Sequence, residues 1–122
     1  MDQIKNVLVL GASFNENRYS NMAIKKLLKY GHKVIGLGAT SGSIDEVKIL
    51  SEPEELEEVH TVTVYLNPMN QLLYYDYVIG LHPERVIFNP GAENREFEQL
   101  LKEKGIKYEH ACTLVMLSLN QF

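Results

Sequence analysis

The sequence predicts an α/β protein with three layers, in which helices cover both faces of a doubly wound parallel sheet of about five strands. Short apolar runs alternate with segments of helical period along the chain, as in parallel sheets. The runs are continuously apolar, which is typical of strands buried on both faces. The 122 residues suit a single domain, residues 1–122, and fall well short of an eight-unit barrel. With right-handed crossovers, the expected arrangement is Rossmann-like.

The predicted strands are the apolar runs themselves, and most of them end at glycine or at turn residues. The first run is rich in valine and stops at Gly11, which is a common way to leave a buried strand. A further run at 47–49 predicts at most a short strand. The five main strands are expected at residues 4–10, 33–37, 61–66, 85–88 and 106–109.

The predicted helices begin at capping residues. Asn67 and Pro68 are typical of an N-cap followed by the first helical residue. Ser51 and Glu54 have the spacing of a capping box, which predicts an acidic helix through the glutamate-rich stretch that follows. The other helices are expected at 20–30, 67–80 and 94–104, with a short final helix or turn at 113–119.

Composition excludes several classes of protein. The net charge is −4, but five of the acids lie in residues 52–58, and without that run 12 bases face 11 acids. No basic cluster is interleaved with aromatic residues, so we expect no nucleic-acid partner. No apolar run is long enough for a membrane span, no signal peptide is evident, and Cys112 alone cannot form an internal disulfide. These absences predict a cytoplasmic protein that does not bind membranes.

Small and amide residues gather in the segments that leave the predicted strands. In a doubly wound sheet, ligands bind outside the carboxyl ends of the strands. Small residues let a ligand approach the backbone, and their N–H groups can point at an anion. The sequence therefore predicts a small-molecule site suited to an anion at this edge, although small polar residues are common in any one such loop. The segments are residues 11–15, 38–42, 67–68, 89–91 and 111–112.

The first of these segments departs from the dinucleotide fingerprint. Ser13 and Glu16 stand where its second and third glycines would be, and residues 36–39 lack the acid that holds ribose hydroxyls. A standard NAD site is therefore disfavoured. Ser13, Arg18 and Ser20 still suit phosphate, since they offer a hydroxyl, a fixed cation and a helix N-terminus. A solvated arginine and an ordinary N-cap serine are the alternatives for Arg18 and Ser20.

Several motifs carry a family resemblance. The chain resembles the small stand-alone CoA-binding proteins, which are Rossmann-like domains related to the N-terminal domain of the succinyl-CoA synthetase alpha subunit. The resemblance covers nearly the whole chain in order and at the family's spacing. The motifs are VLGASFN at 9–15, RYSN at 18–21, GHKVI at 31–35, NPGAEN at 89–94, GI at 105–106 and ACTLVM at 111–116.

The resemblance implies a non-catalytic module that binds coenzyme A, or an acyl-CoA, through its ADP moiety at the carboxyl ends of the strands. Two departures affect this expectation: Asn15 is followed by Glu16 in place of proline, and residues 37–39 lack the usual Val-Asn-Pro, which changes the adenosine site. The implied residues are Gly11, Ala12, Ser13, Asn15, Arg18, Tyr19 and Ser20 for the diphosphate, Leu37, Gly38, Ala39 and Thr40 for the adenosine, and Asn67 and Pro68 for the opposite wall, together with Gly91.

Two alternatives belong to other classes. One is a small enzyme, either an NAD(P)-dependent oxidoreductase or an acyl-transfer enzyme that uses Cys112. His110 lies two residues before Cys112, so a thiolate–imidazole pair is conceivable, but a lone cysteine is more often a small buried hydrophobe, and we favour that interpretation. The other is a structural subunit with a vestigial site.

We assign no catalytic residue and no metal ligand, and we expect His32, His60 and His82 at the surface. A homo-oligomer or a protein partner stays open.

Overall fold

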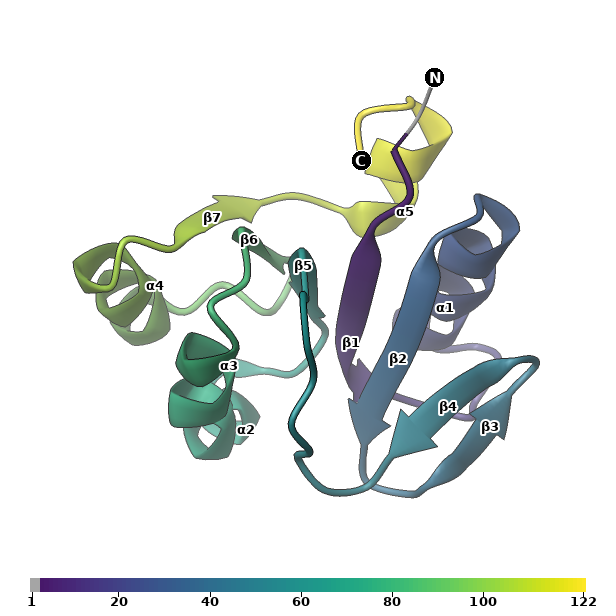
Figure 1. The fold of residues 1–122 in the computed structure, drawn as a ribbon, viewed down its shortest axis with the longest axis horizontal. Helices are drawn as coiled ribbons and strands as arrows, with labels where there is room; N and C mark the ends of the chain where they lie inside the picture. Colours follow the sequence, from purple (N-terminus) through teal and green to yellow (C-terminus); the bar gives the residue numbers. More distant parts are fainter. Residues whose placement is uncertain (1–2) are drawn as a thin grey trace.

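In a computed structural model, which describes residues 3–122, the chain forms a seven-stranded sheet between two layers of helices (Figure 1). The strand order is β3-β4-β2-β1-β5-β6-β7, and every neighbouring pair is parallel except β3 with β4. The three-layer α/β prediction is confirmed. The elements are β1 (Asn6–Ala12), α1 (Tyr19–Lys29), β2 (Lys33–Gly38), β3 (Gly42–Ile44), β4 (Val47–Leu50), β5 (Thr61–Val64), α2 (Pro68–Gln71), the 3-10 helix η1 (Leu72–Tyr74), α3 (Tyr75–Leu81), β6 (Arg85–Phe88), α4 (Arg95–Glu103), β7 (Lys107–His110) and α5 (Thr113–Ser118).

The sheet has two more strands than the five main ones expected. The short strand expected at 47–49 is β4, which adds to the edge beside β2. The strand that was missed is β3, which folds back on β4 through a turn at Asp45, where φ is +51°. Because β3 has three residues and begins Gly-Ser, it lacks the apolar run from which the other strands are predicted.

The sheet separates two apolar clusters. Val7 and Val9 of β1 belong to the cluster beneath α1 and α5, whereas Leu8 and Leu10 belong to the cluster beneath α3 and α4. Successive side chains of a strand point to opposite faces, so β1 contributes to both layers. The helix residues in these clusters are Ile24, Leu27 and Leu117 on the first face and Val78, Phe97 and Leu101 on the second.

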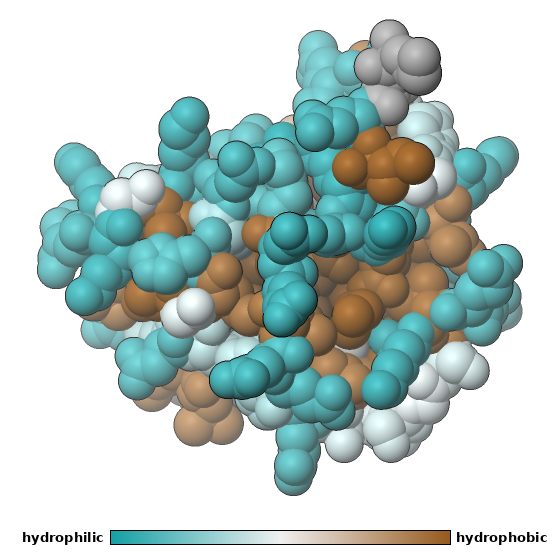
Figure 2. All heavy atoms as spheres, viewed as in Figure 1, coloured by the Kyte–Doolittle hydropathy of each residue, from teal (hydrophilic) through white to brown (hydrophobic). Residues whose placement is uncertain are grey.

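The acidic helix predicted from Ser51 is wrong, because residues 51–60 form no helix or strand. Only Leu56 and Val59 pack inward there, and an amphipathic helix needs three to four apolar residues in two turns. The backbone of Glu58 is left-handed, with φ at +55°, and its carbonyl accepts a 3.0 Å hydrogen bond from Asn6 Nδ2. Apolar surface consequently remains visible over β1 and β2 in Figure 2.

The helix predicted at 67–80 is divided into α2, η1 and α3, and it ends at His82 in the left-handed conformation. Asn67 is the N-cap, as predicted, and its side chain accepts from Asn70 N at 2.9 Å. The division falls beside Gln71, whose fully buried side chain bonds to two carbonyl groups outside the helix. This anchoring ties α2 to neighbouring loops and separates it from α3.

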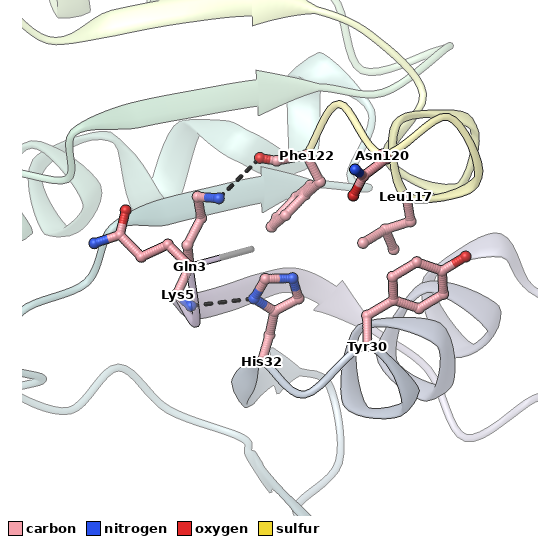
Figure 3. A pocket seen from close by; sticks show the side chains of 7 residues that line it. All are labelled: Gln3, Lys5, Tyr30, His32, Leu117, Asn120 and Phe122. Carbon is pink, nitrogen blue, oxygen red and sulfur yellow. Dashed lines mark hydrogen bonds between the residues drawn. The ribbon is translucent and has the colours of Figure 1, made fainter. Parts of the chain in front are cut away.

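The amino ends of the strands meet the last residue of the chain (Figure 3). Lys5 Nζ donates to the carbonyl oxygen of Phe122 at 3.0 Å. Arg85 Nη2 donates to the same oxygen at 3.2 Å. The Phe122 ring meets the edge of His32 at 5.1 Å, and Lys5 N donates to His32 Nδ1 at 3.1 Å. His32 is therefore buried, and its expected surface position is wrong because the packed aromatic ring covers it.

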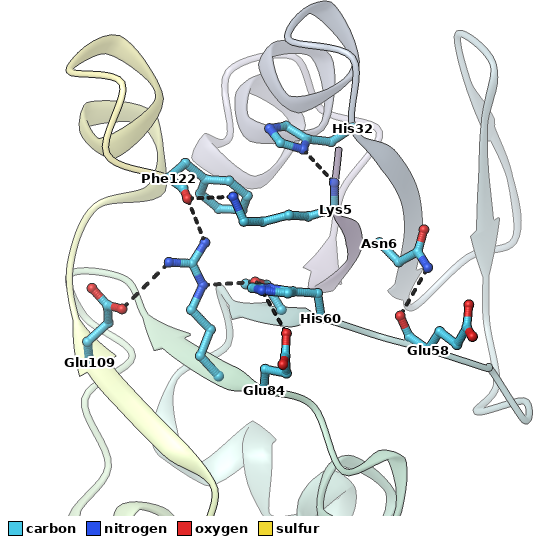
Figure 4. A network of polar contacts seen from close by, with 10 residues as sticks. Lys5, Asn6, His32, Glu58, His60, Glu84, Glu109 and Phe122 are labelled. Carbon is cyan, nitrogen blue, oxygen red and sulfur yellow. Dashed lines mark hydrogen bonds and ion pairs between the residues drawn. The ribbon is translucent and has the colours of Figure 1, made fainter. Parts of the chain in front are cut away.

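A polar network continues along this edge (Figure 4). Arg85 Nε donates to Thr61 Oγ1 at 2.9 Å, and its Nη1 lies 3.8 Å from Glu109 Oε2. His60 is half-buried and pairs with Glu84 at 2.9 Å. Its burial lowers the pKa of the imidazole from the usual value. The third histidine expected at the surface, His82, is exposed.

Candidate functional site

A cleft of about 730 Å³ opens at the carboxyl ends of β1, β2, β5 and β6, on the edge of the sheet away from Phe122. These four strands are neighbours in the sheet, so the segments that leave them meet at one place. Three of the residues expected there, Asn15, Thr40 and Pro68, lie outside the cleft lining. The structure brings the others together in the lining: Gly11, Ala12, Ser13, Arg18, Tyr19, Ser20, Leu37, Gly38, Ala39, Asn67 and Gly91.

Sequence reasoning missed part of the lining. Asn70, Leu73 and Tyr74 lie three, six and seven residues after Asn67, a spacing that places residues on one side of a helix. That spacing was available from the sequence once Asn67 was recognised as a cap. The complete missed set is Tyr65, Leu66, Asn70, Leu73, Tyr74, Pro90 and Ala92.

The loop after β1 is held close to the end of β2. Gly11 has a left-handed backbone, with φ at +95°. A Cβ atom on Gly38 would lie 2.2 Å from the carbonyl oxygen of Ala12, so only glycine allows the two strands to leave the sheet this close together. Asn21 Nδ2 donates to Ser13 O at 3.0 Å and fixes the loop to α1.

The first turn of α1 borders the same end of the cleft. Arg18 is the N-cap residue and makes no side-chain cap bond. Ser20 lies inside the first turn and is 4% exposed, so the alternative that it is the N-cap is wrong. The first turn holds no acidic residue. Its free N–H groups and the helix dipole favour an anion at this position.

Charge in the cleft comes from a single side chain. Within residues 3–122, Arg18 is the only charged residue of the lining, and its guanidinium has no hydrogen-bond or ion-pair partner. Glu16, which would oppose an anion if it faced inward, instead accepts a 3.1 Å hydrogen bond from Lys25 Nζ at the surface. The cleft therefore presents one unpaired cation, at its β1–α1 end.

A buried polar contact network holds the wall formed by α2. Gln71 Nε2 donates to Leu66 O at 2.8 Å and to Ala92 O at 2.7 Å. Asn94 Nδ2 donates to Gln71 Oε1 at 2.9 Å and to the hydroxyl oxygen of Tyr75 at 2.8 Å. This network fixes the end of β5, α2 and the loop after β6 relative to one another, so the wall is preorganised.

The floor of the cleft depends on Asn89, the residue that directly follows β6. Its Nδ2 donates to Thr63 Oγ1 at 2.7 Å and to Val64 O at 2.9 Å, and its Oδ1 accepts from Thr113 N at 2.8 Å. The side chains of Thr63 and Thr113 are themselves 2.7 Å apart. One buried amide thus joins β5, β6 and the start of α5.

Tyr65 carries a buried hydroxyl that makes no well-formed hydrogen bond within residues 3–122, although the hydroxyl groups of Thr63 and Thr113, which bond to each other, lie close enough to influence it. Burial raises the pKa of this phenol to about 12. We expect Tyr65→Phe to raise the free energy of unfolding by about 1 kcal/mol at pH 8. Phenylalanine has no hydroxyl, so folding of the variant no longer removes a hydroxyl from water without forming a good hydrogen bond in its place.

The same substitution changes the alkaline response. In the unfolded chain a tyrosine ionises near pH 10, whereas native Tyr65 stays protonated to about pH 12. Stability is therefore lost as pH rises between these values, and at pH 11 Tyr65→Phe should remove about 1.4 kcal/mol of that loss. Urea titrations at pH 8 and pH 11 measure both effects, with Tyr30→Phe at an exposed tyrosine as the control. Equal alkaline losses in wild type and Tyr65→Phe would contradict the burial effect.

Cys112 and His110 do not form the pair that the enzyme alternative requires. His110 Nε2 lies 2.9 Å from Glu98 Oε2 on α4, so that the imidazole is directed to a carboxylate. Cys112 is the N-cap residue of α5. It is half-buried, so the expectation of a fully buried core cysteine is wrong, because a residue at the start of a surface helix keeps partial exposure.

Among residues 3–122, no three His, Cys, Asp or Glu side chains gather where they could hold a metal ion. None of the helices in this part of the chain combines the length and apolar character needed to cross a membrane.

Comparison with solved structures shows which proteins share the fold. A crystal structure described as an uncharacterized protein shares 45% identity, with a TM-score of 0.95 over 99% of this chain and 100% of that one. The cell-free protein ID.343 from Thermus thermophilus shares 24% identity, with a TM-score of 0.86 over 98% and 92%. The dinucleotide forming acetyl-coenzyme A synthetase 1 of Ca. Korarchaeum cryptofilum, solved with phosphate and ADP, shares 17%, with a TM-score of 0.70 over 85% of this chain and 25% of that one. No curated protein matches the sequence.

The fold and the cleft at its carboxyl edge are those of a Rossmann-like domain, as the neighbours also are. Residues 5–118 match the family described as CoA binding domain. The chain belongs to that family, and the resemblance noted in the sequence is confirmed.

Proposed function

We propose that this chain is a non-catalytic cytoplasmic module that binds coenzyme A, or an acyl-CoA, through the ADP moiety. The observation that carries the proposal is the 730 Å³ cleft whose single charged lining residue, Arg18, stands unpaired beside the first turn of α1. A diphosphate is the part of CoA that needs such a cation and such a helix terminus. Membership of the CoA-binding family supports the same ligand.

The strand order suggests how the ligand lies. The adenosine occupies the end of β2 around Leu37 and Ala39, and the diphosphate crosses the loop after β1 near Ser13 and Arg18. The remainder extends toward the ends of β5 and β6. The acetyl-coenzyme A synthetase neighbour has the same fold in the matching part of its chain, and this likeness supports a ligand of the CoA type.

Calorimetric titration of the purified protein with CoA, ADP and NAD tests the proposal. CoA should bind and raise the melting temperature, because a ligand selective for the native state stabilises that state by mass action. ADP alone should give part of the effect. Stronger binding of NAD than of CoA at equal concentration would overturn the proposal. Mass spectrometry of the undenatured protein adds a direct search for a co-purifying nucleotide.

Arg18→Ala should weaken CoA binding by about ten- to a hundredfold, since a charge-assisted hydrogen bond contributes about 1.5–3 kcal/mol. The side chain is exposed and has no partner within the described part of the chain, so the variant should fold normally. Arg95→Ala, at the start of α4 and outside the cleft, is the matched control. Unchanged CoA affinity in Arg18→Ala would leave Arg18 as a solvated surface residue.

A further inference from the structure

We infer that the preferred ligand carries an apolar acyl chain on the thiol of CoA, and that the β5–β6 end of the cleft receives this chain. The inference rests on the proposed function and specifies its ligand. It depends on three features of that end: exposed apolar side chains, absence of charge, and distance from the cation Arg18.

The apolar end of the cleft leaves apolar surface exposed to water, which is unfavourable. This end is formed by Leu66, Leu73, Tyr74 and Pro90. Leu73 is 87% exposed although it lines the cleft. Leu66 and Tyr74 are only partly buried against the core. Exposed leucine beside a cleft favours an apolar occupant, because covering both surfaces removes them from water together.

Within residues 3–122, no charged residue lines the same end; the carboxylate of Glu93, which accepts from Gly91 N at 2.8 Å, borders it outside the lining. Residues 61–75 contain no Asp, Glu, Lys or Arg, and neither do residues 86–92. These two stretches supply the whole lining on the β5 and β6 side. The cleft is thus divided, with its one cation at the β1–α1 end and a neutral surface at the other. A ligand complementary to both ends joins an anionic head to an uncharged, apolar tail.

The sheet provides a ruler for the distance between the two ends. Neighbouring strands lie about 4.8 Å apart, so the ends of β1 and β6, separated by β5, are about 10 Å apart. With the adenosine at β2 and the diphosphate at β1, the pantetheine arm crosses β5 and β6. The thiol and any group on it then emerge beside Leu73 and Pro90, at the apolar end.

The test compares free CoA with octanoyl-CoA, kept below its micelle concentration, by calorimetry. Wild type should bind octanoyl-CoA about tenfold more tightly, since even partial burial of several methylene groups gives that gain. Leu73→Ser should remove most of this preference, with a much smaller loss of affinity for free CoA, because only the end of the CoA arm lies beside Leu73. The matched control is Leu72→Ser, at a neighbouring exposed leucine that lies outside the cleft lining and should keep the preference.

The other outcomes are distinguishable. Equal binding of CoA and octanoyl-CoA by wild type would overturn the acyl inference alone and leave the proposed function standing. Absence of binding for both ligands would overturn the proposed function and the inference with it. Light scattering on the unliganded protein tests whether a second copy of the chain, and not an acyl chain, covers the apolar end of the cleft. If Leu73→Ser converts a dimer to a monomer and keeps the acyl preference, the leucine serves an interface and the inference is wrong.

Discussion

Replacing Gly38 by alanine should destabilise the protein by about 3 kcal/mol, one of the largest effects expected of a single methyl group. The added Cβ would lie 2.2 Å from the carbonyl oxygen of Ala12 and 3.1 Å from its carbonyl carbon. Both are backbone atoms, so no flexible side chain can move aside to make room for the added methyl group. The register of β1 against β2 already shifts between Leu10 and Ala12. The ends of β1 and β2 must therefore move apart at the cleft to make room for the methyl group.

Urea denaturation followed by circular dichroism measures the effect of Gly38→Ala. Gly80→Ala in α3 is the matched control, because nothing lies within 4 Å of the added atom there. Alanine favours a helix by about 0.5–1 kcal/mol over glycine, so the control should be neutral or more stable than wild type. A Gly38→Ala variant as stable as the control would show that the close approach of the strands is not needed.

Asn89→Ala should cost about 3–4 kcal/mol of folding stability, because it leaves several buried groups without partners at once. The variant removes the donor to Thr63 Oγ1 and Val64 O and the acceptor for Thr113 N. The loop after β6 should lose its fixed position, so CoA affinity should fall as well. Asn89→Asp keeps the acceptor and should lie between wild type and alanine.

The control for this substitution is Asn17→Ala, at an exposed asparagine outside the cleft lining, which should change stability by less than about 0.5 kcal/mol. The same urea titrations measure all three asparagine variants. If Asn89→Ala loses less than about 1 kcal/mol, the buried amide does not hold the floor of the cleft together.

The layers of the fold could be predicted because burial on both faces leaves a plain record in the sequence. The central strand β1 is a continuous apolar run, and helix α1 follows its apolar stripe to within one residue of the expected bounds. The starts of α2 and α4 lie where they were expected, directly after Asn67 and Asn94. In both, the side-chain amide oxygen accepts a hydrogen bond from a free N–H group of the first helical turn.

The errors arose where local signals competed with packing. Ser51 and Glu54 have capping-box spacing, but too few apolar residues follow them to hold a helix on the sheet. The strand β3 depends on pairing with β4, a contact that leaves no periodic pattern in three residues. His32 is buried by Phe122, which is 90 residues away along the chain and invisible to local reasoning.

The lining of the candidate site was anticipated more fully on the β1–β2 side than on the opposite side, where only Asn67 and Gly91 were expected. Small residues at strand exits marked Gly11, Ser13 and Gly38, because a ligand can approach a bare backbone. The opposite side of the cleft is built from large side chains such as Leu73 and Tyr74. These look like ordinary core residues in a sequence, and only their exposure in the folded chain marks them as lining.

The contact of Phe122 with Lys5 and Arg85 indicates a position at which the protein can be attached to a surface or a label. Residues 5 and 122 are held together at the amino edge of the sheet, and the cleft opens at the carboxyl edge. A sensor chip or a fluorophore attached through a linker at position 122 would therefore leave the cleft facing solution. Such an attachment would allow ligand screening by surface plasmon resonance with the cleft unobstructed, whichever acyl group is offered.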